Sequence, residues 1–117
     1  MLAPVKELRS ERGHCDTRRI ATYLGVSLKQ VAEATRVSRQ LLYQHPDAPK
    51  AQARAAAIER IIADLQALYG SPEAVRAWMK TPAPVFGGRT AWEMIRTEPQ
   101  GLEAVEAYVE SLKEGNP

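Results

Sequence analysis

The sequence predicts an all-α protein with an N-terminal helix-turn-helix trihelical unit, a long connecting helix and a small C-terminal helical module. Apolar residues recur at the i, i+3, i+4 spacing of helices, and no segment alternates apolar and polar residues as a strand would. Capping residues and Gly or Pro terminators bracket these segments. The composition, 44% hydrophobic and 26% charged, is typical of a folded globular chain. One or two small helical units therefore fit the length.

Three short helices are expected within residues 16–49, at 17–24, 28–35 and 39–45. Each is preceded by a residue that commonly caps helix N-termini: Asp16, Ser27 and Ser38. Pro46 ends the third helix, because proline disfavours helical geometry in the residue before it. Residues 1–15 lack clear periodicity and are expected to form a mobile arm.

Residues 50–117 are expected to hold the long helix and the C-terminal module. The long helix, 50–69, is rich in Ala and then carries an apolar stripe of Ile58, Ile61, Ile62, Leu65, Leu68 and Tyr69. Shorter helices are predicted at 72–79, after Thr90, and from Leu102 to Gly115. The segment TPAPVFGGR forms a loop before Thr90, which makes a T-x-x-E capping box with Glu93.

Charge is spread unevenly over the two halves of the chain. Residues 1–60 carry 11 basic and 6 acidic side chains, whereas residues 61–117 carry 5 basic and 8 acidic ones. A basic half suits a polyanion held by phosphate contacts, and an acidic half suits a protein partner. The asymmetry alone is weak evidence, since such differences also arise by chance.

The segment VSLKQVAEATRVSRQLLYQH has the apolar spacing of a helix-turn-helix. Ala32 lies where the two helices would cross, Val37 fills the turn, and Leu42 anchors the second helix. The turn position usually held by Gly is Arg36, which has to adopt or avoid a left-handed conformation at some cost. Pro46 also makes the second helix short for a recognition helix.

The residues of this second helix that remain for DNA contact are Ser38, Arg39, Gln40, Tyr43 and Gln44. Arginine reads guanine bidentately, glutamine reads adenine, and a serine at a helix N-terminus can bind phosphate. The alternative is that these residues are simply solvated, on a trihelical unit used for protein contact. Operator DNA is the partner that the pattern favours.

The second half resembles a known family in the stretch AWMKTPAPVFGGRTAWEMIRTEPQGLEAVEAYVESLKEG. This pattern is similar to the toxin-binding domain of the Xre/MbcA/ParS antitoxins, whose members share a Trp, a Pro-containing loop, a Gly-Arg-Thr turn, a short helix, a Gly and a terminal helix ending in Gly. The resemblance covers about residues 60–117, and the family carries a helix-turn-helix upstream. The matching residues are Trp78, Phe86, Gly88, Arg89, Thr90 and Gly101. Ala91 departs from the pattern, because members often have Pro there.

The resemblance implies an antitoxin encoded beside a RES-domain toxin, an enzyme that consumes NAD or uses it for ADP-ribosylation. Such antitoxins block the NAD pocket of the toxin partly with their C-terminal end and often repress their own operon. The expected toxin-binding residues are Phe86, Gly88, Arg89, Thr90, Trp92, Lys113, Glu114, Asn116 and Pro117. Several have a simpler interpretation: Trp78 and Phe86 as core aromatics, Gly88 as a turn residue, and Arg89 as the partner of an intramolecular carboxylate.

A homodimer within a hetero-oligomeric toxin–antitoxin complex is expected, because paired half-sites need paired recognition helices. The stripe on the long helix motivates this expectation, although the intramolecular core competes for the same residues. The alternative function is a stand-alone transcriptional regulator that dimerises through its C-terminal module.

No catalytic residue, metal site or cofactor is predicted. His14 lies in the expected arm and His45 at a helix end, and the single Cys15 allows neither a disulfide nor a zinc cluster. No apolar run approaches the roughly 18 residues needed to cross a bilayer, and the N-terminus does not read as a signal peptide. We therefore expect a cytoplasmic binding protein with no membrane partner.

Overall fold

A computed structural model of the chain describes residues 6–10 and 13–115. Seven α-helices occur in this part of the chain: α1 (Thr17–Leu24), α2 (Leu28–Thr35), α3 (Arg39–Gln44), α4 (Pro49–Tyr69), α5 (Pro72–Lys80), α6 (Ala91–Thr97) and α7 (Gly101–Lys113). Two short 3-10 helices accompany them, η1 (Lys6–Leu8) and η2 (Pro84–Phe86). The described residues contain no β-strand, so the predicted all-α fold is confirmed.

The predicted caps of the first three helices are confirmed. The Asp16 carboxylate accepts hydrogen bonds from the backbone N–H groups of Arg18 and Arg19. The hydroxyls of Ser27 and Ser38 each accept one hydrogen bond from the backbone N–H group three residues further along the chain. These bonds satisfy N–H groups that have no partner inside the helix. Local sequence therefore determines where α1, α2 and α3 begin.

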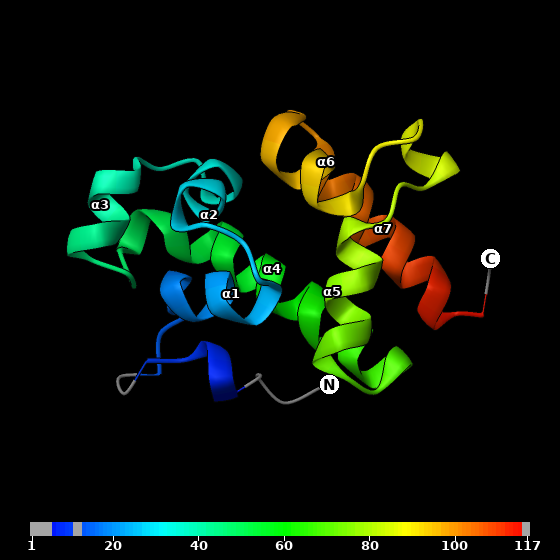
Figure 1. The fold of residues 1–117 in the computed structure, drawn as a ribbon, viewed down its shortest axis with the longest axis horizontal. Helices are drawn as coiled ribbons and strands as arrows, with labels where there is room; N and C mark the ends of the chain where they lie inside the picture. Colours follow the sequence, from blue (N-terminus) through cyan, green and yellow to red (C-terminus); the bar gives the residue numbers. More distant parts are fainter. Residues whose placement is uncertain (1–5, 11–12, 116–117) are drawn as a thin grey trace.

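Helix α4 runs through the middle of the molecule, with α1–α3 gathered toward its first half and α5–α7 toward its second half (Figure 1), and the two groups also contact each other. Its predicted stripe faces the core, and four of its residues are at most 2% exposed: Ile58, Ile61, Ile62 and Leu65. The stripe ends a turn earlier than predicted, since Leu68 and Tyr69 are 40% and 45% exposed. No helix in the described part of the chain is both long and apolar enough to cross a membrane.

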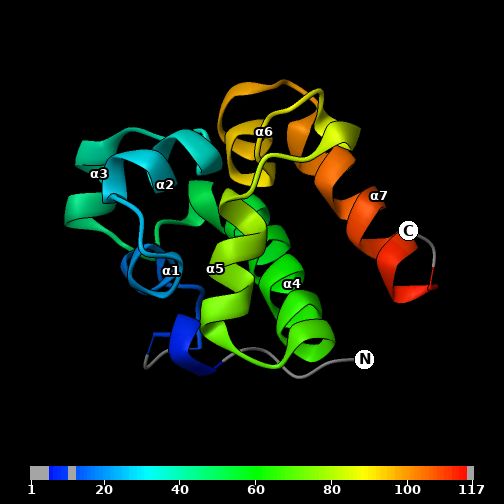
Figure 2. The same ribbon diagram turned by 45° about the vertical axis from the view of Figure 1, so that its right-hand side comes forward.

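Helices α6 and α7 cross closely at Gly101, the first residue of α7 (Figure 2). A Cβ atom built on Gly101 would lie 1.7 Å from the carbonyl oxygen of Met94 and 2.4 Å from its carbonyl carbon. No side chain fits between these two backbones, so the crossing requires glycine. The sequence interpretation placed this glycine before the helix, whereas it is part of it.

Residues 6–10 and 13–15, expected to belong to a mobile arm, pack against the fold. Leu8 and Cys15 are fully buried, and the Arg9 guanidinium pairs with the carboxylate of Glu59 on α4. The backbone of Cys15 also exchanges two hydrogen bonds with the side-chain amide of Gln52. The sequence did not reveal this packing because isolated apolar residues without periodicity carry no signal of burial. Residues 1–5 and 11–12 of the expected arm lie outside the described residues.

Candidate functional site

Helices α2 and α3 are joined by a tight turn in which Arg36 has a left-handed backbone with φ of 62°. Its N–H group donates to the carbonyl oxygens of Ala32 and Glu33 and so closes α2. After the turn, Leu42 is fully buried and Leu41 is half-buried, so one leucine anchors α3 as expected. The structure therefore has two short helices joined by a tight turn, with an arginine at the left-handed position, and the helix-turn-helix function stays a prediction.

The five residues predicted to contact DNA lie together at one short helix and are all exposed: Ser38, Arg39, Gln40, Tyr43 and Gln44. Tyr43 is 59% exposed, so its ring is accessible to a partner. Arg18 of α1 donates a hydrogen bond of 2.9 Å to the carbonyl oxygen of Tyr43, which brings a further cation beside α3. DNA contact by this surface stays a prediction.

The loop between α5 and α6 is a compact turn closed by its own backbone. The carbonyl oxygen of Ala83 accepts hydrogen bonds from the N–H groups of Phe86 and Gly88, and the N–H group of Ala83 donates to Arg89. Gly87 and Gly88 both have positive φ, 66° and 87°. These glycines therefore form the turn, as the simpler interpretation held. The loop holds Arg89 at the start of α6.

Thr90 and Glu93 form the predicted capping box at the N-terminus of α6. The Thr90 hydroxyl accepts from the N–H group of Glu93, and the Glu93 carboxylate accepts from the N–H group of Thr90. These hydrogen bonds lower the pKa of Glu93. The hydroxyl of Thr90 thus has an intramolecular role at the position where a toxin contact was predicted.

Arg89 pairs with the carboxylate of Glu98 at the end of α6. The Arg89 side chain remains about half exposed, at 49%. A partner could therefore reach its guanidinium, but only in competition with Glu98. The simpler interpretation of Arg89 was a pairing with an intramolecular carboxylate, and the structure shows that this carboxylate is Glu98. Glu98 itself was not predicted, because a helix separates the two residues in the sequence.

Phe86 and Trp92, two of the predicted toxin contacts, are core residues with exposures of 7% and 4%. The Trp92 indole N–H donates a hydrogen bond of 2.9 Å to the side-chain carbonyl of Gln30 on α2. A residue this deeply buried presents almost no surface to a partner. The placement favours a structural role for Trp92, which ties α6 to α2.

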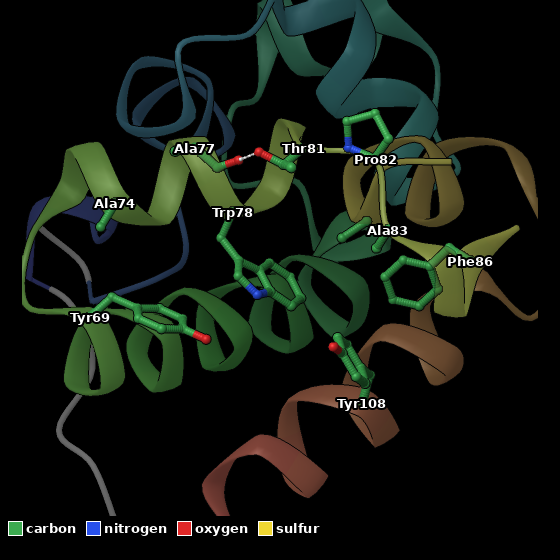
Figure 3. A pocket seen from close by; sticks show the side chains of 10 residues that line it. Tyr69, Ala74, Ala77, Trp78, Thr81, Pro82, Ala83, Phe86 and Tyr108 are labelled. Atoms are coloured by element: carbon green, nitrogen blue, oxygen red, sulfur yellow. Dashed lines mark hydrogen bonds between the residues drawn. The ribbon is translucent and has the colours of Figure 1, made fainter. Parts of the chain in front are cut away.

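An apolar groove of about 360 Å³ opens between α5, the following loop and α7 (Figure 3). Trp78 stacks against Tyr108 with ring centroids 6.0 Å apart, and Phe86 meets Tyr108 edge to face at 5.5 Å. Tyr69 and Pro82 complete the aromatic and apolar lining. Tyr108 lies at the wall of this groove because α7 packs beside α5 and the loop.

The C-terminal candidates lie at the end of α7. The Lys113 ammonium donates to the carboxylates of Glu110 at 3.2 Å and Asp64 at 3.5 Å, and these contacts raise its pKa. Glu114 and Gly115 follow and are exposed, and Gly115 has a φ of 83°. Asn116 and Pro117 lie outside the described residues. The exposed end is thus a segment to which a partner has access.

Two features of the described residues concern the cysteine and possible metal ligands. Burial raises the pKa of the Cys15 thiol to about 12, so it is not a nucleophile at neutral pH. No group of three His, Cys, Asp or Glu side chains able to hold a metal ion occurs in residues 6–10 and 13–115.

These features describe an all-helical fold in which the three short helices α1–α3 pack against a second helical module. Residues 64–115 match the family model of the antitoxin Xre/MbcA/ParS C-terminal toxin-binding domain. This match supports an Xre/MbcA/ParS-type antitoxin in the part of the chain that it covers. No curated protein matches the chain.

Proposed function

We propose that the chain neutralises a RES-domain toxin that consumes NAD or uses it for ADP-ribosylation, as one half of a type II toxin–antitoxin pair. The observation that carries this proposal is the match of residues 64–115 to a toxin-binding domain. The RES-domain identity of the toxin comes from the resemblance of the Trp78 to Gly115 pattern to antitoxins of that class. The chain acts by binding, without a catalytic step or cofactor, in the cytoplasm.

The exposed C-terminal end is the segment proposed to enter the toxin. A pocket built for NAD has to hold a phosphate-bearing ligand and is therefore expected to be electropositive. Glu114 and the terminal carboxylate can form charge-assisted hydrogen bonds in such a pocket. Lys113 is held by Glu110 and Asp64, so the segment begins at a fixed point on the fold.

Deletion of residues 114–117 tests this role. If the segment blocks the pocket, the toxin should regain NAD consumption while the truncated chain still binds it through the loop around Arg89. Glu103→Gln, which removes an exposed carboxylate from the start of α7, is the matched control and should neutralise fully. A truncated chain that silences the toxin completely would show that the folded domain provides the block.

We further propose that the chain represses its own operon through α3. The proposal is supported by the net charge of +5 in residues 1–60 and by the exposure of Arg39, Gln40 and Tyr43 on one short helix. Arg39→Ala should weaken operator binding by about 1–3 kcal/mol if Arg39 reads a base. Arg60→Ala on α4 removes the same charge away from α3 and should have little effect.

Operator binding should also weaken steeply with salt, because phosphate contacts release counterions. Binding that is insensitive to salt, or absent with and without the toxin, would contradict the repressor role. A chain that binds DNA but captures no toxin from its native host would instead be a stand-alone regulator. A RES-domain toxin in the adjacent reading frame favours the antitoxin.

Repression at paired half-sites requires a homodimer, which we include in the proposal. Ile58, Ile61, Ile62 and Leu65 of the stripe first considered for this contact are buried in the core, so a dimer has to use its exposed end or other residues. Four large apolar side chains are exposed among residues 6–10 and 13–115: Tyr43, Leu68, Tyr69 and Val85. Light scattering at micromolar concentration should give a dimeric mass, and a strictly monomeric mass would argue against this part of the proposal.

A further inference from the structure

The C-terminal ends of α2 and α6 meet, although about 60 residues separate them in the sequence. The Arg36 guanidinium donates to the carbonyl oxygens of Arg96 and Glu98 at the end of α6, and also to that of Glu33 on α2. Carbonyl groups in the last turn of a helix carry the negative end of the helix dipole and have room for a further donor. The carbonyl oxygens of Glu33 and Glu98 also accept from the backbone N–H groups of Arg36 and Gly101. A planar guanidinium with five donors can satisfy several of them at once.

A second arginine joins the same two helix ends from α4. Arg54 donates a hydrogen bond of 2.7 Å from Nε to the carbonyl oxygen of Ala34 and one of 3.2 Å from Nη2 to that of Ile95. Partial burial, and then the nearby charge of Arg36, lower the pKa of Arg54. The guanidinium groups of Arg36 and Arg54 lie close together here because the carbonyl groups at the ends of α2 and α6 accept hydrogen bonds from both.

The contact between α2 and α6 continues along both helices. The Arg96 guanidinium donates to the carboxylate of Glu33 at 3.1 Å, and the Trp92 indole reaches Gln30. Helix α3, in contrast, has its main contacts with α2. Its orientation relative to the rest of the protein therefore depends on α2 and on the turn that starts at Arg36.

A glycine would take the left-handed backbone of this turn without strain, whereas an arginine takes it at a cost. The three carbonyl contacts of Arg36 offset that cost, and two of them lie on the toxin-binding domain. The structure therefore gives a reason for the arginine that lies outside the helix-turn-helix itself.

We propose that Arg36 is a positioning residue: it holds the turn before α3 against α6, so that the toxin-binding domain sets the orientation of the DNA-reading helix. Arg36 itself does not contact DNA in this proposal. The inference rests on the proposed operator binding by α3 and extends it. The toxin-binding domain becomes part of the DNA-binding machinery, because its α6 supplies the carbonyl groups that hold the turn.

Two variants of the full chain separate positioning from a direct DNA contact. Arg36→Gly removes the carbonyl contacts but suits the left-handed backbone, so the fold should be kept. Arg36→Lys keeps the charge but lacks the planar fork needed to reach the carbonyl oxygens of both helices. Both variants should lose about tenfold in operator affinity, as for the loss of one base contact, while toxin affinity stays unchanged.

The salt dependence of binding and the orientation of α3 provide the deciding measurements. The slope of log K against log salt should be the same for the wild type and Arg36→Gly, since no phosphate contact is lost. Residual dipolar couplings of the free protein should show that the amides of α3 are reoriented relative to those of α7 in Arg36→Gly. Melting temperature alone would not report this change.

Full operator affinity in Arg36→Lys, with a reduced salt slope in Arg36→Gly, would overturn the proposal and make Arg36 a phosphate contact. Unchanged couplings of α3 relative to α7 in Arg36→Gly would overturn it as well. If the wild type binds no DNA at all, the proposed repressor function fails. The residual dipolar couplings of α3 relative to α7 still decide whether Arg36 positions α3.

Discussion

Replacement of Gly101 by alanine should destabilise the protein through the crossing of α6 and α7. The added Cβ atom would lie 1.7 Å from the carbonyl oxygen of Met94, a distance at which the backbone itself has to move. The two helices would have to separate by more than about 1 Å, in a part of the core packed too tightly to absorb the change.

The expected magnitude is the difference of two effects. Overpacking costs about 1–3 kcal/mol or more, and the better helix propensity of alanine returns up to about 1 kcal/mol. Because the obstacle is backbone and not a flexible side chain, we expect the upper part of that range and a net loss of about 2 kcal/mol. For a chain of this size the melting temperature should fall by about 8 °C.

Urea and thermal unfolding followed by circular dichroism measure this loss. The control is Gly88→Ala, where an added Cβ atom meets nothing within 4 Å and only the positive φ of 87° is strained. That variant should lose only about 1 kcal/mol. If the Gly101→Ala variant were as stable as the wild type, the reasoning would be refuted, because α6 and α7 could then separate without cost.

Two further predictions concern the cap of α6 and the buried thiol. Thr90→Ala should lower the free energy of unfolding by about 1 kcal/mol, because the capping box is lost, whereas Thr90→Ser should keep most of it; denaturant midpoints compare the two. Burial raises the pKa of Cys15 from 9.0 to about 12, so the folded state keeps a proton that the unfolded state releases. Stability should therefore fall between about pH 9 and pH 12, and this fall should be smaller in Cys15→Ala.

Local signals in the sequence were sufficient for the helices and their ends. Asp16, Ser27, Ser38 and the Thr90–Glu93 box cap the helices that they were predicted to cap, because each bond joins residues two or three positions apart. Differences at helix ends are small: α3 stops at Gln44 before Pro46, and α5 extends to Lys80. The toxin-binding pattern from Trp78 to Gly115 was likewise recognisable from the order and spacing of its residues, and the family match covers it.

The proposed division at residue 49 stays a prediction, and contacts between α2 and α6 and between α1 and α5 cross it. Lys80 and Arg76 of α5 donate to the carbonyl oxygens of Gly25 and Tyr23 at the end of α1. Such bonds are invisible in sequence because any exposed arginine or lysine has the chemistry to make them.

Tertiary structure alone decided the roles of the unusual residues. Arg36 was only a departure from the usual glycine until α6 supplied its partners, and Trp92 was a candidate contact until its indole was found bonded to Gln30. In each case the partner lies about 60 residues away, where no periodicity or capping rule applies. Helix caps are satisfied within a few residues, whereas the carbonyl groups at helix ends are satisfied by whatever side chain the packing brings to them.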